Sequence, residues 1–298
     1  MARVVANDIE LEYQSQGAEG APVVVLIMGL GRQLIGWPEQ ECQALVDQGL
    51  RVIRFDNRDC GLSTKFDCAG VPNIAQLTMA KLFGWRLPVP YTLDDMAADT
   101  IGLMDALNID KAHVAGSSLG GIIAQLIACH YPERAVSLTS MMATTGNPSL
   151  PGPTAQVRQI LQLPYVQDYD EEAIVERAIK LWRALSGGVY TIPEETLRRS
   201  YLAAARRAYT PNGNLRQLAA SIVAGDRRRL LRKLQLPTTV FHGDRDPLIP
   251  LAGGLDTAKN IADAEMIIEP GLGHEMPPEV MPRFTEAILR SVRRAEEG

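Results

Sequence analysis

The chain has little of what several classes of protein require. Its longest unbroken apolar run, residues 23–28, is far too short for a bilayer span, which needs about 20 apolar residues. The first residues also lack the apolar stretch of a signal peptide, so we expect a cytoplasmic protein with no membrane partner. The formal net charge of −5 gives no electrostatic reason to expect binding to nucleic acid.

Cysteine and histidine are scarce, with four of each. The cysteines have no metal-ligand spacing, so we predict free thiols, with a Cys60–Cys68 disulfide as the less favoured alternative. They are Cys42, Cys60, Cys68 and Cys129. Internal repeats and low-complexity tracts are also missing. No pattern in the sequence sets the oligomeric state, so a homodimer stays open.

What the sequence does contain is enough apolar material for a full core. The chain has 298 residues and is 46% hydrophobic, which suits one large α/β domain with an insertion or two small domains. Residues 23–28 are continuously apolar rather than alternating, which is typical of a strand buried on both faces of a sheet. Further strand patterns alternate with helical ones, and they lie at residues 51–55, 112–115, 136–142, 238–241 and 266–268.

Strand patterns are missing between residues 147 and 235, where only helical segments are predicted. We therefore predict an α/β fold with a mostly parallel, doubly wound sheet and an inserted helical cap. The core would comprise residues 1–146 and 236–298, and the cap residues 147–235. A second irregular stretch, residues 56–91, is longer than most loops inside a compact domain, and such loops usually have a functional role or move.

The most informative stretch joins the predicted strand at 112–115 to an apolar, helix-compatible run. It contains Gly116, Ser118 and Gly120 in the pattern Gly-x-Ser-x-Gly. In such a strand–turn–helix the serine has a strained backbone, so only small residues fit two positions before and after it. The pentapeptide alone is weak evidence, because glycine-rich turns also bind phosphate in nucleotide-binding folds.

A serine hydroxyl becomes a good nucleophile only when a base removes its proton, and that base needs a carboxylate beside it. Three of the four histidines, His113, His130 and His242, lie within or directly at the end of predicted strands and helices. His274 differs because it follows the last predicted strand in a glycine-rich loop. We therefore predict that His274 is the base.

Two aspartates compete for the role of the acid, and both follow the strand at 238–241. Asp244 comes early in the turn, where it could serve mainly to cap the turn. Asp246 lies two residues later, is followed by Pro247, and is better placed to project toward the next loop. The order Ser118, Asp246, His274 is the order expected of α/β-hydrolases.

These motifs make the chain resemble the α/β-hydrolase family over nearly its whole length. Met28-Gly29-Leu30 stands where the family usually has His-Gly, and residues 56–63 are similar to the family's Asp-x-Arg-Gly-x-Gly-x-Ser loop. The other matching stretches are residues 116–120, 242–250 and 271–274. The Met-Gly pair, the Asn-Arg-Asp loop and residues 90–96 resemble the bacterial subgroup that includes aclacinomycin methylesterase.

The resemblance implies roles for individual residues. Ser118 would be the nucleophile, Asp246 the acid and His274 the base, while the backbone N–H groups of Leu30 and Leu119 would form the oxyanion hole. In the family, a histidine at the position of Met28 generally supports the loop that carries the first oxyanion donor, here residues 28–31. This chain has methionine there, so the resemblance does not say which residue supports the loop. No metal or organic cofactor is needed for this chemistry.

The expected function is that of a serine hydrolase cleaving small-molecule carboxylic esters through an acyl-enzyme. A methyl ester of a polyketide-like or aromatic acid is one candidate substrate. Lactone hydrolysis, carbon–carbon bond hydrolysis and perhydrolysis are alternatives that use the same three residues. A ligand-binding protein with this fold and little turnover is an alternative of another class.

Other conspicuous residues have simpler interpretations. Asp56, Arg58 and Asp59 favour a structural turn with ion pairs over a catalytic role, and residues 227–229, three arginines, favour a solvated helix face.

Apolar side chains are candidates for the substrate pocket. Met28 and Met141 end predicted strands at the catalytic edge, which favours an apolar pocket for the acyl or alcohol group. Trp182 is a further candidate for the pocket lining, and the core is the alternative location of all three side chains.

Overall fold

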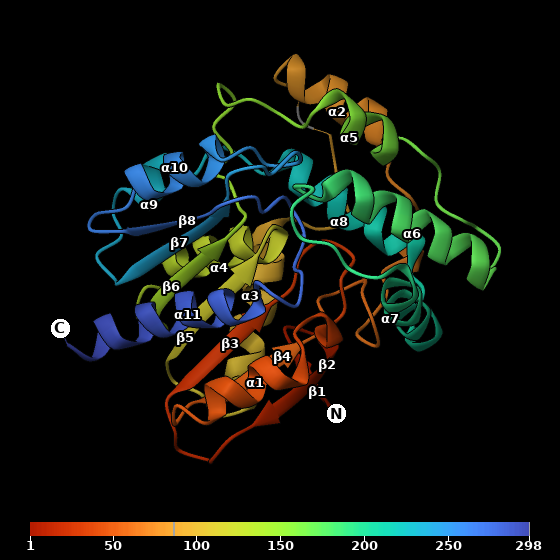
Figure 1. The fold of residues 1–298 in the computed structure, drawn as a ribbon. Helices are drawn as coiled ribbons and strands as arrows, with labels where there is room; N and C mark the ends of the chain where they lie inside the picture. The colour runs from red at the N-terminus through yellow and green to blue at the C-terminus, as the bar shows by residue number, and fades with distance from the viewer. Residues whose placement is uncertain (86, 298) are drawn as a thin grey trace.

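The computed structural model describes residues 1–85 and 87–297, and it contains one eight-stranded sheet in the order β1-β2-β4-β3-β5-β6-β7-β8 (Figure 1). The β1/β2 and β2/β4 pairs are antiparallel, and the other neighbouring strands are parallel. The strands are β1 (Ala2–Ala6), β2 (Ile9–Gln16), β3 (Val23–Ile27), β4 (Arg51–Phe55), β5 (Ala112–Ser117), β6 (Ala135–Met141), β7 (Thr238–Gly243) and β8 (Glu265–Glu269). The predicted mostly parallel α/β sheet is confirmed.

Helices cover both faces of the sheet and form a separate group beside it (Figure 1). They are α1 (Glu39–Val46), α2 (Ile74–Leu82), α3 (Leu93–Ala106), α4 (Leu119–His130), α5 (Ala155–Leu161), α6 (Glu171–Leu185), α7 (Glu194–Arg207), α8 (Pro211–Val223), α9 (Arg228–Leu231), α10 (Ala252–Lys259) and α11 (Met281–Glu296). Within the described residues, no helix is long and apolar enough to cross a membrane.

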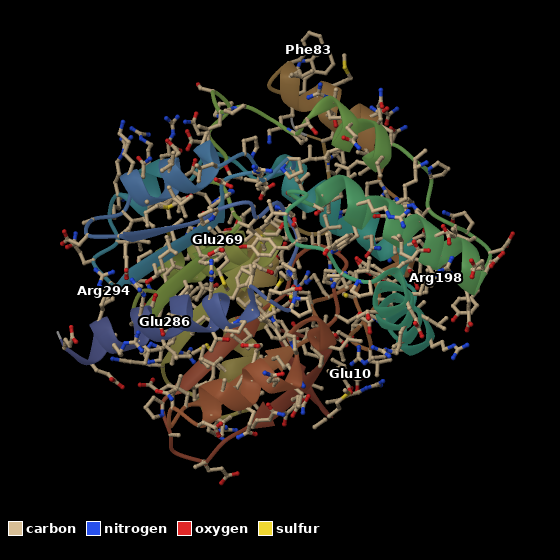
Figure 2. All side chains as sticks on the ribbon, viewed as in Figure 1. Glu10, Phe83, Arg198, Glu269, Glu286 and Arg294 are labelled. Carbon is tan, nitrogen blue, oxygen red and sulfur yellow. The ribbon has the colours of Figure 1, made fainter. Side chains whose placement is uncertain are left out.

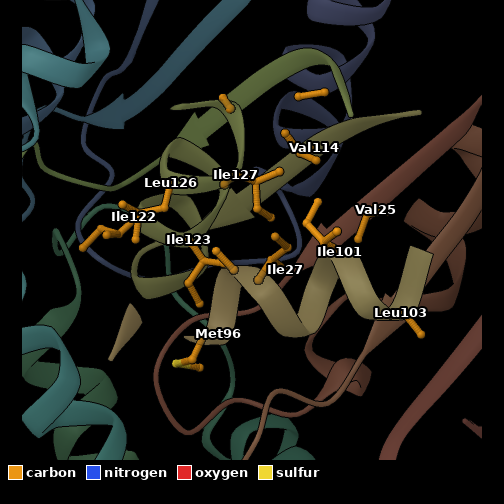
Figure 3. Packing of buried hydrophobic residues seen from close by; sticks show 14 of the residues in the cluster. Val25, Ile27, Met96, Ile101, Leu103, Val114, Ile122, Ile123, Leu126 and Ile127 are labelled. Carbon is orange, nitrogen blue, oxygen red and sulfur yellow. The ribbon is translucent and has the colours of Figure 1, made fainter. Parts of the chain in front are cut away.

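Apolar side chains fill the two faces of the sheet in separate clusters. Side chains alternate along a strand, so neighbouring residues of β3 point to opposite faces. Val25 and Ile27 pack with residues of α3 and α4, as Figure 3 shows. Val24 and Leu26 pack with α1 and α11 on the other face. All of β3 is buried, as its continuous apolar pattern predicts.

Helices α5 to α9 lie between β6 and β7, where the sequence predicts the helical cap. The short helix α9 also lies in this stretch. The boundaries of the cap at residues 147 and 235 stay a prediction, since only the helices themselves are defined by the structure.

Buried ion pairs attach the cap helices to the loop that follows β4. Arg216 of α8 donates two hydrogen bonds of 2.8 Å to the carboxylate of Asp59, and both side chains are at most 1% exposed. Arg207 of α7 donates a 2.7 Å hydrogen bond to Asp56, which is fully buried. The predicted structural ion pairs of this loop are therefore present: the partners of Asp56 and Asp59 come from the cap, whereas Arg58 pairs with Asp99 of α3.

One interpretation of the arginine cluster is wrong. Arg227 does not lie on a solvated face, because it is buried and donates hydrogen bonds to Gln125 and to the carbonyl oxygens of Gly225 and Thr144. Burial lowers the pKa of its guanidinium to about 10. Arg228 and Arg229 are not among the buried side chains. The four cysteines are free thiols, as predicted.

The Arg216–Asp59 pair generates a prediction about stability. Replacing Arg216 with methionine leaves the Asp59 carboxylate buried without its charge partner, and breaking a buried pair in this way typically costs about 3 to 5 kcal/mol. Urea unfolding of Arg216→Met should show this loss in the free energy of unfolding.

Arg198, labelled in Figure 2, provides the matched control on the cap surface. It pairs with Glu172, Glu176 and Glu194, whose side chains are more than half exposed, so Arg198→Ala should destabilise the fold much less than Arg216→Met. Equal losses in the two variants would contradict the structural role of the buried pair.

His113 of β5 generates a prediction about pH. Its burial disfavours the imidazolium ion and lowers the pKa from 6.5 to about 4. The unfolded chain therefore gains a proton below about pH 6.5, whereas the folded chain stays neutral at His113 down to about pH 4. The stability associated with this residue is fully present above pH 6.5 and is lost as the pH falls between these values.

Replacing His113 with glutamine should therefore reduce the acid sensitivity of folding. Between pH 7 and pH 4.5, we expect the wild-type protein to lose about 2 to 3 kcal/mol more unfolding free energy than His113→Gln. Urea unfolding at the two pH values measures the difference. An unchanged pH dependence in the variant would contradict the assignment.

Candidate active site

Ser118 lies in the tight turn between β5 and α4. Its backbone has φ 55° and ψ −119°, a conformation that costs strain in any residue with a side chain. A Cβ atom at Gly116 would collide with the carbonyl of Gly120, and one at Gly120 would collide with the carbonyl of Ile27. The two glycines of the motif are therefore required by space, as the sequence indicates.

His274 and Asp246 meet Ser118 at the carboxyl ends of the parallel strands. The Nε2 atom of His274 lies 2.9 Å from Ser118 Oγ, and its Nδ1 atom lies 2.6 Å from Asp246 Oδ2. The three residues follow β5, β7 and β8, so strands far apart in the sequence bring them to one edge of the sheet. The structure thus places the three predicted residues in one hydrogen-bonded chain.

Asp246 is held as a carboxylate by its surroundings. Burial alone would raise the pKa of this carboxyl, but the charge of His274 and hydrogen bonds from His242 and His274 lower it well below its usual range. The other carboxylate oxygen, Oδ1, accepts hydrogen bonds from the N–H groups of Leu248 at 2.9 Å and Ile249 at 2.8 Å. An ionised group is therefore present beside the imidazole ring.

Asp244 has a different position. Its Oδ1 atom accepts a 2.6 Å hydrogen bond from the N–H of Gly271 and so braces the loop that carries His274. The imidazole faces Asp246 instead. Both aspartates therefore contribute to the geometry of the loop, but only Asp246 contacts the His274 ring among the described residues.

The chain leaving β3 passes directly over Ser118. A Cβ atom at Gly29 would lie 3.2 Å from Ser118 Cβ and 3.8 Å from Oγ, so the peptide between Gly29 and Leu30 is next to the hydroxyl. Leu119 is the first residue of α4, where backbone N–H groups have no intrahelical acceptor. Across residues 1–85 and 87–297, neither Leu30 nor Leu119 donates its N–H to another protein group.

Asn57 supports this loop at the point where the sequence offers no histidine. Its side-chain amide is buried and donates a 3.1 Å hydrogen bond to the carbonyl oxygen of Met28. The contact was not predicted, although Asn57 belongs to the Asn-Arg-Asp loop that the sequence singles out. The turn that follows β4 therefore supports this loop, and the side chain of residue 28 does not.

The structure does not bring all three predicted pocket residues together, because Trp182 lies apart from Met28 and Met141. Met28 and Met141 are buried in the cluster beneath α1 and α11, and the Met28 methyl group lies against Gly36. Trp182 of α6 belongs to a third cluster inside the cap, with Ile179 and its neighbours. The role of these side chains in binding substrate stays a prediction.

The cap also contacts the loop that carries His274, and the sequence gives no sign of this. The N–H of His274 donates a 2.7 Å hydrogen bond to the carbonyl of Leu185 at the end of α6. Glu275 is buried and accepts hydrogen bonds from the Gly187 N–H, at 3.0 and 3.2 Å, and from Ser186. Burial raises the pKa of Glu275, because these neutral donors only partly offset the loss of water.

Known proteins resemble the chain over nearly its whole length. The family model for the alpha/beta hydrolase fold matches residues 22–279. Rhodomycin D methylesterase DnrP of Streptomyces peucetius is 27% identical over 311 residues, which cover 98% of each chain. A 2-hydroxy-6-oxononadienedioate/2-hydroxy-6-oxononatrienedioate hydrolase of Burkholderia vietnamiensis is also 27% identical, over 97% of this chain and 92% of that protein.

Solved structures show the same fold. The enol-lactonase of Burkholderia xenovorans LB400 superimposes with a TM-score of 0.73 at 20% identity, covering 98% of this chain and 100% of the other. The meta-cleavage product hydrolase CumD of Pseudomonas fluorescens IP01 gives a TM-score of 0.76 at 20% identity, covering 99% and 98%. With a family model that spans most of the sequence, the chain belongs to the alpha/beta hydrolase fold family.

Proposed function

We propose that this protein hydrolyses carboxylic esters through an acyl-enzyme formed on Ser118. The observation that carries the proposal is the hydrogen-bonded chain from Ser118 through the His274 ring to Asp246. The similarity to two methylesterases over 98% of the chain supports this reaction class, carboxylic ester hydrolysis. The roles of the individual residues are our proposal.

In the first half of the reaction, Ser118 Oγ attacks the ester carbonyl carbon while His274 Nε2 takes the hydroxyl proton. Asp246 accepts the hydrogen bond from Nδ1–H, which holds the ring in the required tautomer and stabilises the imidazolium ion. His274 then gives its proton to the departing alcohol. The bond between carbonyl carbon and alcohol oxygen breaks, and the acyl group stays on Ser118.

The tetrahedral intermediate carries negative charge on the former carbonyl oxygen. We assign its stabilisation to the N–H groups of Leu30 and Leu119, because both are free of protein acceptors within the described residues and flank Ser118. One such donor typically contributes about 3 to 4 kcal/mol to stabilising the transition state. In the second half, His274 activates a water molecule that releases the acid.

For the substrate, we propose a methyl ester of a polyketide-like or aromatic acid. This rests on similarity to two methylesterases named for rhodomycin D, at 27% and 26% identity over 98% of the chain. Met28, Met141 and Trp182 are the proposed apolar contacts. The placement of Trp182 in the cap makes it the best candidate for a contact with the larger part of the substrate.

A second candidate is carbon–carbon bond hydrolysis, which the similarity to a 2-hydroxy-6-oxononadienedioate/2-hydroxy-6-oxononatrienedioate hydrolase favours. A panel of methyl esters, lactones and vinylogous diketo acids, with acyl and alcohol size varied independently, separates these activities. A ligand-binding protein with little turnover would bind members of the panel without converting them.

Replacing Ser118 with alanine tests the nucleophile. The variant should lose at least about 10⁴-fold in kcat on p-nitrophenyl esters, because it lacks the hydroxyl on which the acyl-enzyme would form. A fluorophosphonate probe should label the wild-type protein at Ser118 and leave the variant unlabelled. Circular dichroism provides the control for folding. Turnover by a folded Ser118→Ala protein would show that the nucleophile is another residue.

A pair of aspartate variants tests the acid. Asp246→Asn removes the charge beside His274 and favours the wrong tautomer, so kcat should fall about 10⁴-fold. Asp244→Asn is the matched control, because an amide oxygen can still accept the hydrogen bond from Gly271. We expect its kcat to stay within about 10-fold of the wild-type value. A larger loss in Asp244→Asn than in Asp246→Asn would reverse the assignment.

A further inference from the structure

A buried glutamine of the cap reaches the proposed oxyanion loop. Gln217 of α8 is fully buried, and its Oε1 atom accepts a 2.8 Å hydrogen bond from the N–H of Gly31. Its Nε2 atom donates a 2.7 Å hydrogen bond to the carbonyl of Arg58. Both ends of the amide are satisfied, so the side chain is fixed between two core loops.

Gly31 directly follows Leu30, the proposed oxyanion donor. Its backbone has φ 67°, and a Cβ atom there would lie 2.6 Å from the Oδ1 atom of Asn214, which is also on α8. The backbone of the oxyanion loop therefore packs directly against α8 at Gly31. Glycine provides the needed conformation but places little restraint on the neighbouring peptides.

Restraint comes instead from hydrogen bonds to three consecutive peptide groups. Asn57 donates to the carbonyl of Met28, and the N–H of Arg32 donates to the carbonyl of Gly29 at 3.1 Å. The Gly29 carbonyl and the Leu30 N–H belong to the same planar peptide. Gln217 binds the N–H of the next peptide, between Leu30 and Gly31. The peptide that carries the Leu30 N–H thus lies between two others that side chains hold in place.

We propose that Gln217 is a positioning residue that holds the Leu30 N–H toward the oxyanion from the cap. The inference rests on the proposed function, because it assumes that Leu30 stabilises the tetrahedral intermediate. The cap helix itself is anchored one residue away by the buried Arg216–Asp59 pair. The inserted helices therefore take part in catalysis by setting the geometry of the oxyanion hole.

A residue that acts in this way affects the transition state more than the bound substrate. In Gln217→Met the Gly31 N–H loses its acceptor, and we expect kcat to fall about 10- to 100-fold, less than for removal of an oxyanion donor, with KM within about 3-fold. An arylboronic acid forms a tetrahedral adduct on the nucleophile, so its inhibition constant should rise in proportion to the loss in kcat/KM.

Gln125 of α4 provides the matched control. It is also fully buried, and its hydrogen bonds in the described part of the chain go to Ser140 and Arg227 rather than to residues 28–31. Gln125→Met should lower the urea midpoint while keeping kcat and the boronate inhibition constant near wild-type values. If Gln217→Met does not fold, Gln217→Asn, whose shorter side chain cannot reach Gly31, is measured instead with the same expected loss.

The outcomes separate the two proposals. Wild-type kcat and boronate affinity in a folded Gln217 variant, or a change in KM alone, would overturn the positioning role while ester hydrolysis stands. Absence of ester turnover and of phosphonate labelling in the wild-type protein would overturn the proposed function itself. A loss of kcat and boronate affinity confined to the Gln217 variants supports the inference.

Discussion

The backbone of Ser118 is the constraint on which the site depends. A turn with positive φ between β5 and α4 is tight enough to bring Gly120 against the Ile27 carbonyl of β3. The chain leaving β3 must then pass beside the hydroxyl, which places Leu30 there. The same turn starts α4 at Leu119, whose N–H has no intrahelical acceptor. The proposed nucleophile and both proposed donors therefore follow from one strained residue, whose cost of about 1 to 3 kcal/mol is offset by the buried elements on either side.

Buried charge is the second constraint. Asp56 and Asp59 are fully buried in the loop after β4, and an unpaired carboxylate there would be strongly unfavourable. Their partners Arg207 and Arg216 come from α7 and α8, so the cap helices cannot leave the core without exposing or orphaning these charges. This makes the cap a structural part of the site. The loop after β4 and the cap helices are distant in the sequence, but these ion pairs join them into one structural unit.

Much of the fold, and the three residues proposed as the triad, could be predicted because local steric and spacing rules determine them. Gly116 and Gly120 are required by space around one turn, and His274 stands out by its position after the last strand. The choice between Asp244 and Asp246 depends on two residues of spacing. In the structure, Asp246 is hydrogen-bonded to the His274 ring, while Asp244 accepts the Gly271 N–H. Gln217 could not be predicted, since helical periodicity does not say which loop of the core a buried face will meet. The interpretation of Arg227 is wrong for a related reason. A run of arginines is typical of a solvated face, but this guanidinium is buried and donates to the nearby Gly225 carbonyl and to the distant Thr144 carbonyl.

The cap contacts both loops that carry the proposed catalytic groups, and this bears on how one family acts on different compounds. Leu185 accepts the N–H of His274, while Gln217 accepts the N–H of Gly31. A change in the cap that moves these two contacts would therefore also shift the proposed base and the proposed oxyanion donor relative to Ser118. Packed elements transmit small displacements rather than absorbing them, so we expect the position of the cap and the proposed catalytic geometry to be coupled. It follows that a variant carrying the cap helices of a relative would have to preserve these two backbone contacts. Without them, His274 and Leu30 would not keep their positions relative to Ser118.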